Sequence, residues 1–267
     1  MNERSMRNRI ALTILAAVSG AMLAAAVGQP GYLDVLPDLT SVVPPPPQKG
    51  DPRYEADRRV FRLTRSLLST PRGALAARDV PYTMPDLMRD FSCAAGVGLS
   101  PEKTPATYRL LINADADTAR ANEAAKQRWK HLRPFQIDRG AICESKELLV
   151  KSFDYPSGHV THGWTVGLVL ANLEPDRATP ILSRAVAYGE SRIVCGAHNM
   201  SAVEAARLGA TVSMQIIAQT ARYQADFAAA KAELDDLRRR PDAMAETKVC
   251  AAERALTGRS ILSSLRK

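Results

Sequence analysis

Residues 156–173 read PSGHVTHGWTVGLVLANL, a proline and glycine turn followed by a run that is apolar on nearly every side. From His159 to Leu173 the run contains no Asp, Glu, Lys or Arg. A helix that is apolar all round is normally buried within a protein core. The stretch therefore predicts a central helix that other helices surround.

The segments on either side of this stretch also have helical patterns. Strong helix formers fill residues 114–133, and Pro134 marks the end of that segment. Period-two runs and Asn-Gly or Asp-Gly turns are sparse. We predict an all-α fold, a single-domain helical bundle with a buried central helix. Its other helices are expected at 53–69, 85–95, 180–191, 201–222 and 224–240.

The N-terminus has the layout of a secretory signal. Three arginines within the first nine residues precede an apolar run that ends in Ala24-Ala25-Ala26. The run is also at the short end of a membrane anchor, but we favour cleavage near Ala26 or Gly28. No later segment is long and apolar enough to span a bilayer, so we expect no stable membrane span. The predicted parts are a signal peptide at 1–26, a Pro-rich extended arm at 27–51 and a helical domain at 52–267.

Composition limits the classes of partner. The formal net charge of +8 would draw anionic substrates towards a cationic cleft. The basic residues are spread along the chain and aromatic content is low, so nucleic-acid binding is not expected as the main role.

Four cysteines lie far apart without a CxxC pair, and an exported chain can join them in up to two disulfides. Of the three possible connectivities we favour Cys93 with Cys143 and Cys195 with Cys250. A zinc site is much less expected at these spacings.

Three short motifs carry the candidate chemistry. The first is Lys126-x6-Arg133-Pro134. Residues seven apart on a helix share a face to within about 20°, so both side chains could converge on one anion. Arg offers a planar fork for phosphate and Lys a compact charge. Alone, such a basic pair is more often a solvated surface feature.

The second motif is Pro156-Ser157-Gly158-His159, which precedes the apolar helix. A phosphate placed there would meet backbone N–H groups at a helix N-terminus, and Gly158 would allow close backbone approach. Ser157 could add a hydroxyl donor or simply cap the helix.

The third motif is Ser191-Arg192-x5-His198, within GESRIVCGAH at 189–198. In order and spacing the three motifs resemble those of the bacterial class A non-specific acid phosphatases, in the wider family of type 2 phosphatidic acid phosphatases and vanadium haloperoxidases. The resemblance extends over most of the chain after the signal, including the Pro-rich arm, FSCA at 91–94 and Gly163-Trp164.

The resemblance implies hydrolysis of phosphate monoesters in two steps. His198 would attack phosphorus, and His159 would protonate the leaving group and then activate water. It also implies a periplasmic protein, a homo-oligomer, inhibition by vanadate and product release as inorganic phosphate. Three cations already neutralise the phosphate, so we expect no cofactor and no metal. The residues expected to hold the phosphoryl oxygens are Lys126, Arg133, Ser157, Gly158 and Arg192.

One residue of the family pattern is missing. The motif continues His-x3-Asp, and that Asp position is Ala202 here. In a serine-protease triad, removing the equivalent carboxylate costs about 10⁴ in rate, so a loss of roughly 10²–10⁴ is expected unless another group orients His198. Glu204 is one candidate, but Ser201 and Glu204 fit a helix capping box better. A backbone carbonyl or a water could also hold the ring.

Other functions stay open at this point. A homologue that has lost turnover would bind phosphate without hydrolysing esters. His162 lies one turn after His159 and could complete a three-histidine metal site with His198, although it more often would line the pocket. His131 is expected to be solvated. A haloperoxidase is disfavoured by the chain's size and few aromatics, and a lipid phosphatase by the lack of a later membrane span.

Overall fold

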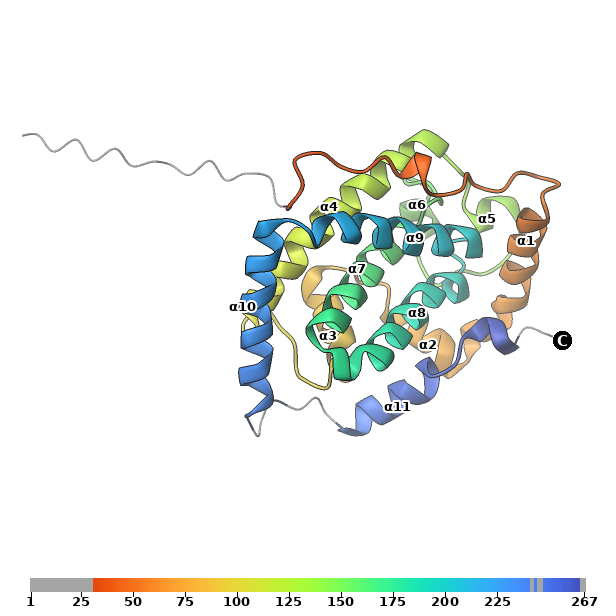
Figure 1. Cartoon of the computed structure of the whole chain (residues 1–267). Coiled ribbons are helices and arrows are strands. Elements are labelled where there is room, and N and C mark those ends of the chain that lie inside the picture. The colour runs from red at the N-terminus through yellow and green to blue at the C-terminus, as the bar shows by residue number, and fades with distance from the viewer. Residues whose placement is uncertain (1–30, 241–242, 244–246, 265–267) are drawn as a thin grey trace, which may run out of the picture.

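Helix α7 (Gly158–Leu173) lies at the centre of the bundle, as the apolar stretch predicts (Figure 1). The computed structural model describes residues 31–240, 243 and 247–264, so the expected signal peptide lies outside the described residues. Among the described residues there is no strand, which confirms the all-α prediction. Within the same ranges, no helix combines the length and the apolar character that crossing a bilayer requires.

Three long helices enclose α7 and supply its core contacts. They are α4 (Pro105–Trp129), α8 (Ala178–Cys195) and α9 (Met200–Ile217). Val166 and Leu170 of α7 are fully buried. The approach of α8 depends on Gly163, because a Cβ there would lie 2.3 Å from Cδ1 of Tyr188.

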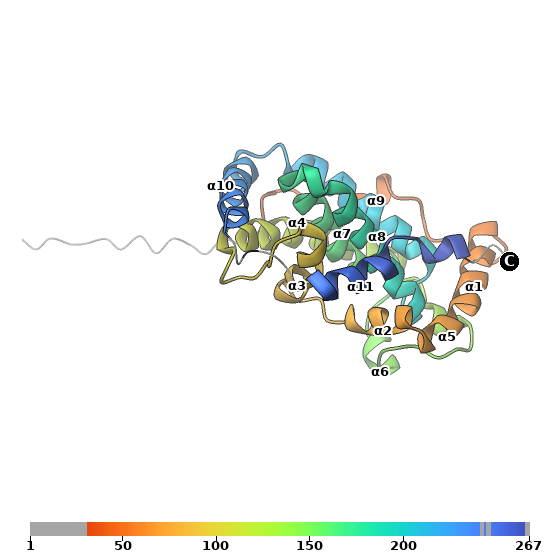
Figure 2. The same cartoon turned by 90° about the horizontal axis from the view of Figure 1, so that it is seen from below.

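The remaining helices pack around this centre. Helix α10 (Ala221–Arg238) lies against α4, and α11 (Thr247–Thr257) crosses the underside of the bundle (Figures 1 and 2). There α11 contacts α8, α2 (Pro71–Arg78) and α3 (Met84–Ala95). The other helical elements are α1 (Pro52–Thr64), α5 (Pro134–Ile137), α6 (Lys146–Leu149) and the 3-10 turns η1 (Leu39–Ser41), η2 (Arg65–Ser69), η3 (Pro175–Arg177) and η4 (Ile261–Ser264).

The expectation that Lys126 and Arg133 share one helix face is wrong. Helix α4 ends at Trp129, and Lys130 takes the left-handed conformation (φ 47°) that terminates helices. Arg133 is extended (φ −73°, ψ 155°) and precedes α5. The residue before a proline is disfavoured in the α region, so the helix has to stop before Pro134.

The arm at 31–51 packs on the bundle and crosses α4 and α9 (Figure 1). Leu39 and Val43 are buried in a small apolar cluster with Tyr155 and Ala202. The hydroxyl of Tyr155 also donates a hydrogen bond to the carbonyl of Pro44. The arm thus covers the outer side of the segment that leads into α7.

The expected disulfide pairing is wrong. Cys93 is joined to Cys250, and Cys143 to Cys195. Helix α11 packs on α3 and brings the first pair to a Cα–Cα distance of 5.1 Å. The loop after α5 lies against the end of α8, where Cys143 N donates to the carbonyl of Cys195 at 3.1 Å. These are contacts between distant segments, which cysteine spacing does not report.

Candidate active site

The three motifs meet around one cavity of about 590 Å³. It lies where α4 ends, α7 begins and α8 turns into α9. The sequence-predicted residues that line it are Lys126, Arg133, Gly158, His159, His162, Arg192 and His198, joined by Tyr82, Glu144 and Ser152 among others.

Three of these residues are buried cations. Arg192 is 2% exposed; one guanidinium nitrogen pairs with Glu144, while Nε and Nη1 have no hydrogen-bond partner among the described residues. Burial lowers the pKa of Lys126 and of Arg133 below their ordinary values. A buried charge or donor without a partner is costly, so the cavity is built to receive an anion.

The loop before α7 contributes in two ways. A Cβ on Gly158 would lie 3.2 Å from Lys126 Nζ, so the glycine keeps room beside the ammonium group. Ser157 is the N-cap of α7, and its Oγ accepts from Val160 N at 3.3 Å. Ser157 is buried and is not among the cavity-lining residues, so its contact with the phosphate stays a prediction.

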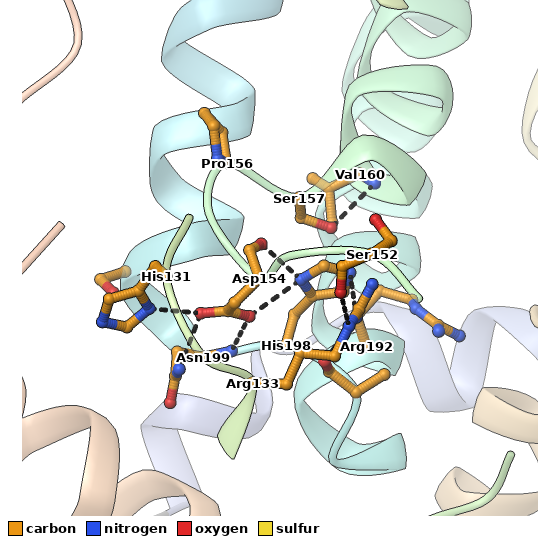
Figure 3. Close-up of polar contacts among 12 residues, drawn as sticks. His131, Arg133, Ser152, Asp154, Pro156, Ser157, Val160, Arg192, His198 and Asn199 are labelled. Atoms are coloured by element: carbon orange, nitrogen blue, oxygen red, sulfur yellow. Dashed lines mark hydrogen bonds and ion pairs between the residues drawn. The ribbon is translucent and has the colours of Figure 1, made fainter. Parts of the chain in front are cut away.

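Both ring nitrogens of His198 have polar partners (Figure 3), and these partners define its tautomer. Arg133 Nη1 lies 3.0 Å from its Nε2, and a guanidinium can only donate, so Nε2 carries the lone pair. Nδ1 then carries the hydrogen, which it donates to Asp154 through the backbone O (2.8 Å) and Oδ1 (3.0 Å). Burial and then Arg133 lower the pKa of His198 to about 3, so the ring is neutral in weak acid.

Asp154 was not predicted as a site residue. Its carboxylate is fully buried and accepts from Asn199 N at 3.1 Å, Asn199 Nδ2 at 2.7 Å and His131 Nδ1 at 3.2 Å. Burial alone would raise the pKa of Asp154, but the bonds from His131 and His198 outweigh it and lower the pKa below its usual value. The expectation that His131 is solvated is wrong, because its side chain is only 12% exposed and contacts this carboxylate.

The capping box expected at Ser201 and Glu204 is also wrong. The N-cap of α9 is Asn199, and Ser201 N and Oγ instead donate to Asp57 at 2.9 and 2.5 Å. Glu204 is exposed on α9, while His198 is buried. Glu204 therefore does not orient the ring of His198.

His159 is anchored from below the cavity. Its Nε2 donates to the carbonyl of Asp79 at 2.8 Å, and its ring stacks on Tyr188 at 4.9 Å between centroids. Nδ1 is therefore the nitrogen that remains for substrate. Burial, followed by Arg192, His162 and His198, lowers the pKa of His159 well below its ordinary value.

His162 lines the cavity beside His159. Its Nδ1 lies 2.7 Å from Asp115 Oδ1, and its ring stacks with Tyr82. His159, His162 and His198 do not form a close group of potential ligands. Within the described residues the one such group is Cys143, Glu144 and Cys195, whose cysteines are already joined in a disulfide.

Comparison with known proteins first identifies the superfamily. Residues 109–226 match the PAP2 superfamily. The chain is 38% identical over 196 residues to an acid phosphatase of Zymomonas mobilis; the aligned region covers 73% of this chain and 74% of the relative. It is 32% identical over 205 residues to a non-specific acid phosphatase of Providencia stuartii, with coverage of 76% and 83%. A non-specific acid phosphatase of Salmonella typhimurium is 32% identical over 197 residues, with coverage of 73% and 79%.

Within that superfamily, the chain belongs to the bacterial non-specific acid phosphatases. Its enzyme class is that of the phosphoric monoester hydrolases. The family prediction made from the three motifs is thus confirmed.

Proposed function

We propose that the protein is an exported, metal-independent acid phosphatase that hydrolyses phosphate monoesters through a phosphohistidine at His198. One arrangement carries the proposal. Buried Arg192 has two donors without a partner in the described part of the chain, and it lines the same cavity as His198, which carries the nucleophilic Nε2 of the proposal.

The first chemical step would form an Nε2–P bond and break the P–O bond of the ester. The incoming phosphoryl group would take over the hydrogen bond from Arg133 and thereby free the lone pair of Nε2. Arg192 and Lys126 would hold the non-bridging oxygens, with Ser157 and Gly158 at the helix N-terminus. Fixed donors aimed at the charge of the transition state usually supply the largest part of catalysis.

In that first step His159 would give a proton from Nδ1 to the departing oxygen of the ester. The second step would return the enzyme to its starting state, with His159 accepting a proton from the attacking water. Water oxygen would bond to phosphorus as the Nε2–P bond breaks, releasing inorganic phosphate. A bound phosphoryl dianion would favour protonated His159, against the burial that lowers its pKa in the empty site.

Several further properties belong to the same proposal. The predicted binding residues would grip the phosphoryl group, which all phosphate monoesters share, and this supports a broad range of small substrates. The phosphate site would also accept vanadate, an inhibitor of similar shape. The domain division at 1–26, 27–51 and 52–267, the periplasmic location and a homo-oligomer are proposed from the sequence layout and the family.

A second candidate function is a phosphate-binding homologue without turnover. It is favoured by Ala202, which cannot supply the carboxylate that the family motif places there.

Hydrolysis of p-nitrophenyl phosphate across pH 4–8 with EDTA separates the two candidates. We expect turnover that survives EDTA, disappears in His198→Ala and leaves a phosphorylated histidine after acid-free quenching of the parent. Tight vanadate binding without turnover in the parent would instead establish the binding homologue.

A further inference from the structure

A carboxylate is present beside His198 although position 202 is alanine. We propose that Asp154 is the positioning residue for His198 and replaces the carboxylate that the family motif places at 202. This inference rests on the proposed function of His198. The two positions lie in different motifs, since Asp154 precedes the loop at 156–159 and Ala202 belongs to α9.

The bond from His198 Nδ1 to Asp154 Oδ1 is held in place by the rest of the carboxylate's partners. Asn199 donates its backbone N–H to Oδ1 and its side-chain amide to Oδ2. His131 contacts Oδ2 from the side of Asp154 that faces away from His198 (Figure 3). With 0% exposure and these fixed donors, the carboxylate has one orientation available.

Position 202 lies next to the same segment. The carbonyl of Ala202 accepts from Ser157 N at 3.1 Å, and its side chain belongs to the apolar cluster that contains Tyr155. Both Asp154 and Ala202 are fully buried. If a carboxylate at 202 also reached His198, as the family motif implies, it would repel the carboxylate of Asp154. The apolar residue at 202 avoids that repulsion.

The backbone carbonyl of Asp154 is the rival for this role. It accepts from His198 Nδ1 at 2.8 Å and could fix the tautomer by itself. A neutral carbonyl, however, gives little stabilisation to the positive ring that forms when Nε2 bonds phosphorus. An ionised carboxylate at 3.0 Å does stabilise it, as in a Ser-His-Asp triad.

The first test compares Asp154→Asn with Asp57→Asn. Asp57 is a matched control, because it is equally buried and accepts from Ser201 at the start of α9. By analogy with the triad we expect Asp154→Asn to lose about 10²–10⁴-fold in kcat. Its KM and its affinity for inorganic phosphate should stay within about threefold, because the cations remain. Asp57→Asn should keep kcat per folded molecule within about threefold.

The second test moves the carboxylate. Asp154→Ser should be nearly inactive, and Asp154→Ser with Ala202→Asp should recover at least about tenfold in kcat. A merely structural role for Asp154 would not produce this rescue. Either of two results overturns the inference: Asp154→Asn with kcat near that of the parent, or a double variant that binds phosphate normally but is no faster than Asp154→Ser.

A readout without turnover separates this inference from the proposed function. The ¹⁵N shifts of His198 report which ring nitrogen carries the proton. Arg133 and the backbone carbonyl of residue 154 remain in every variant, so we expect the Nδ1–H form in all three proteins. The Nδ1 shift itself should differ between the parent and Asp154→Ser and return towards the parent value in the double variant, because a charged acceptor polarises the N–H bond more than a neutral one. An Nδ1 shift in Asp154→Ser equal to that of the parent would overturn the positioning role, whereas a parent that does not hydrolyse esters would overturn only the phosphatase mechanism.

Discussion

Two carboxylates line the cavity beside its cations: Glu123 lies 3.8 Å from Lys126 Nζ, and Glu144 contacts Arg192. The side chain of Glu144 is 17% exposed. In the empty site it partly neutralises a buried guanidinium, and an incoming dianion must share or take over that interaction. In the proposed mechanism Glu144 would therefore compete with the substrate for Arg192.

Glu144→Gln is expected to bind inorganic phosphate more tightly, by about 3–10-fold, because one negative charge leaves the site. KM should fall in parallel, and phosphate release should slow. Glu147→Gln is the control, because Glu147 is exposed on α6 and its carboxylate accepts a hydrogen bond from the Ser145 hydroxyl. Calorimetric titration with phosphate decides the matter, and weaker binding by Glu144→Gln would contradict the assigned competition.

The expected pH dependence follows from the two histidines of the proposed mechanism. His198 must be neutral to attack, and its pKa is about 3, so kcat/KM should rise as pH rises through that value. His159 must be protonated in the complex, so kcat should fall as pH rises above its pKa there. The expected profile is a bell on the acid side of neutrality.

His159→Ala tests whether His159 is the general acid, the role that is expected to set the alkaline limb of the pH profile. With p-nitrophenyl phosphate the leaving group needs little protonation, so the variant should lose less activity than with an alkyl phosphate. Equal losses on both substrates would remove His159 from the role of general acid.

At the scale of elements, the contact between α7 and α8 links packing to chemistry. Tyr188 of α8 packs against Gly163 of α7 and also stacks on the ring of His159. A change in this contact should therefore alter the position of His159, the proposed general acid, as well as the packing of the core.

Gly163→Ala would place a Cβ 2.3 Å from Tyr188 Cδ1. Overpacking of this kind typically lowers the free energy of unfolding by about 1–3 kcal/mol. Displacement of Tyr188 should also lower kcat, because its ring stacks on that of His159. Gly98→Ala is the control, because a Cβ at position 98 would have its nearest neighbouring atom, Lys103 Nζ, at 3.8 Å, an ordinary contact distance. Urea unfolding and kcat would be measured together; a destabilised variant with normal kcat would separate the packing of Tyr188 from the function of His159.

The sequence predicted the elements better than the contacts between them. The apolar run after Gly158 identified α7, and Ser157 was correctly considered as its cap, because both signals are local. Asp154 was missed because its contact with His198 joins residues 44 positions apart. The end of α4 was placed too late because Lys130, a good helix former, takes a left-handed conformation that no helix-propensity pattern signals.

At the scale of the whole molecule, the two disulfides hold different parts of the bundle. Cys93–Cys250 ties α3 to α11 on the underside, whereas Cys143–Cys195 ties the loop that carries Glu144 to the end of α8. Cys195 is three residues before His198. Only the second bridge adjoins the candidate site.

Replacing either pair by serine should lower the free energy of unfolding by about 2–5 kcal/mol. We expect the variant that lacks Cys93–Cys250 to keep kcat per folded molecule, and the variant that lacks Cys143–Cys195 to lose kcat as well. Each variant serves as the control of the other, with unfolding curves and kcat measured at a temperature where both are folded. Equal kcat in the two variants would show that the loop at Glu144 does not need its bridge.

The bridge from Cys93 to Cys250 has a consequence for how a cell makes this enzyme. The two cysteines are 157 residues apart, so the bond cannot close until most of the polypeptide has been synthesised. Disulfides form in oxidising compartments and are rare in the reducing interior of the cell. If the chain is exported as proposed, it would lack both bridges until it reached an oxidising compartment, including Cys143–Cys195 beside the candidate site. The late bridge would delay stabilisation and the bridge beside the site would delay full activity, so a broad phosphatase would mature only after leaving the metabolites that it could hydrolyse.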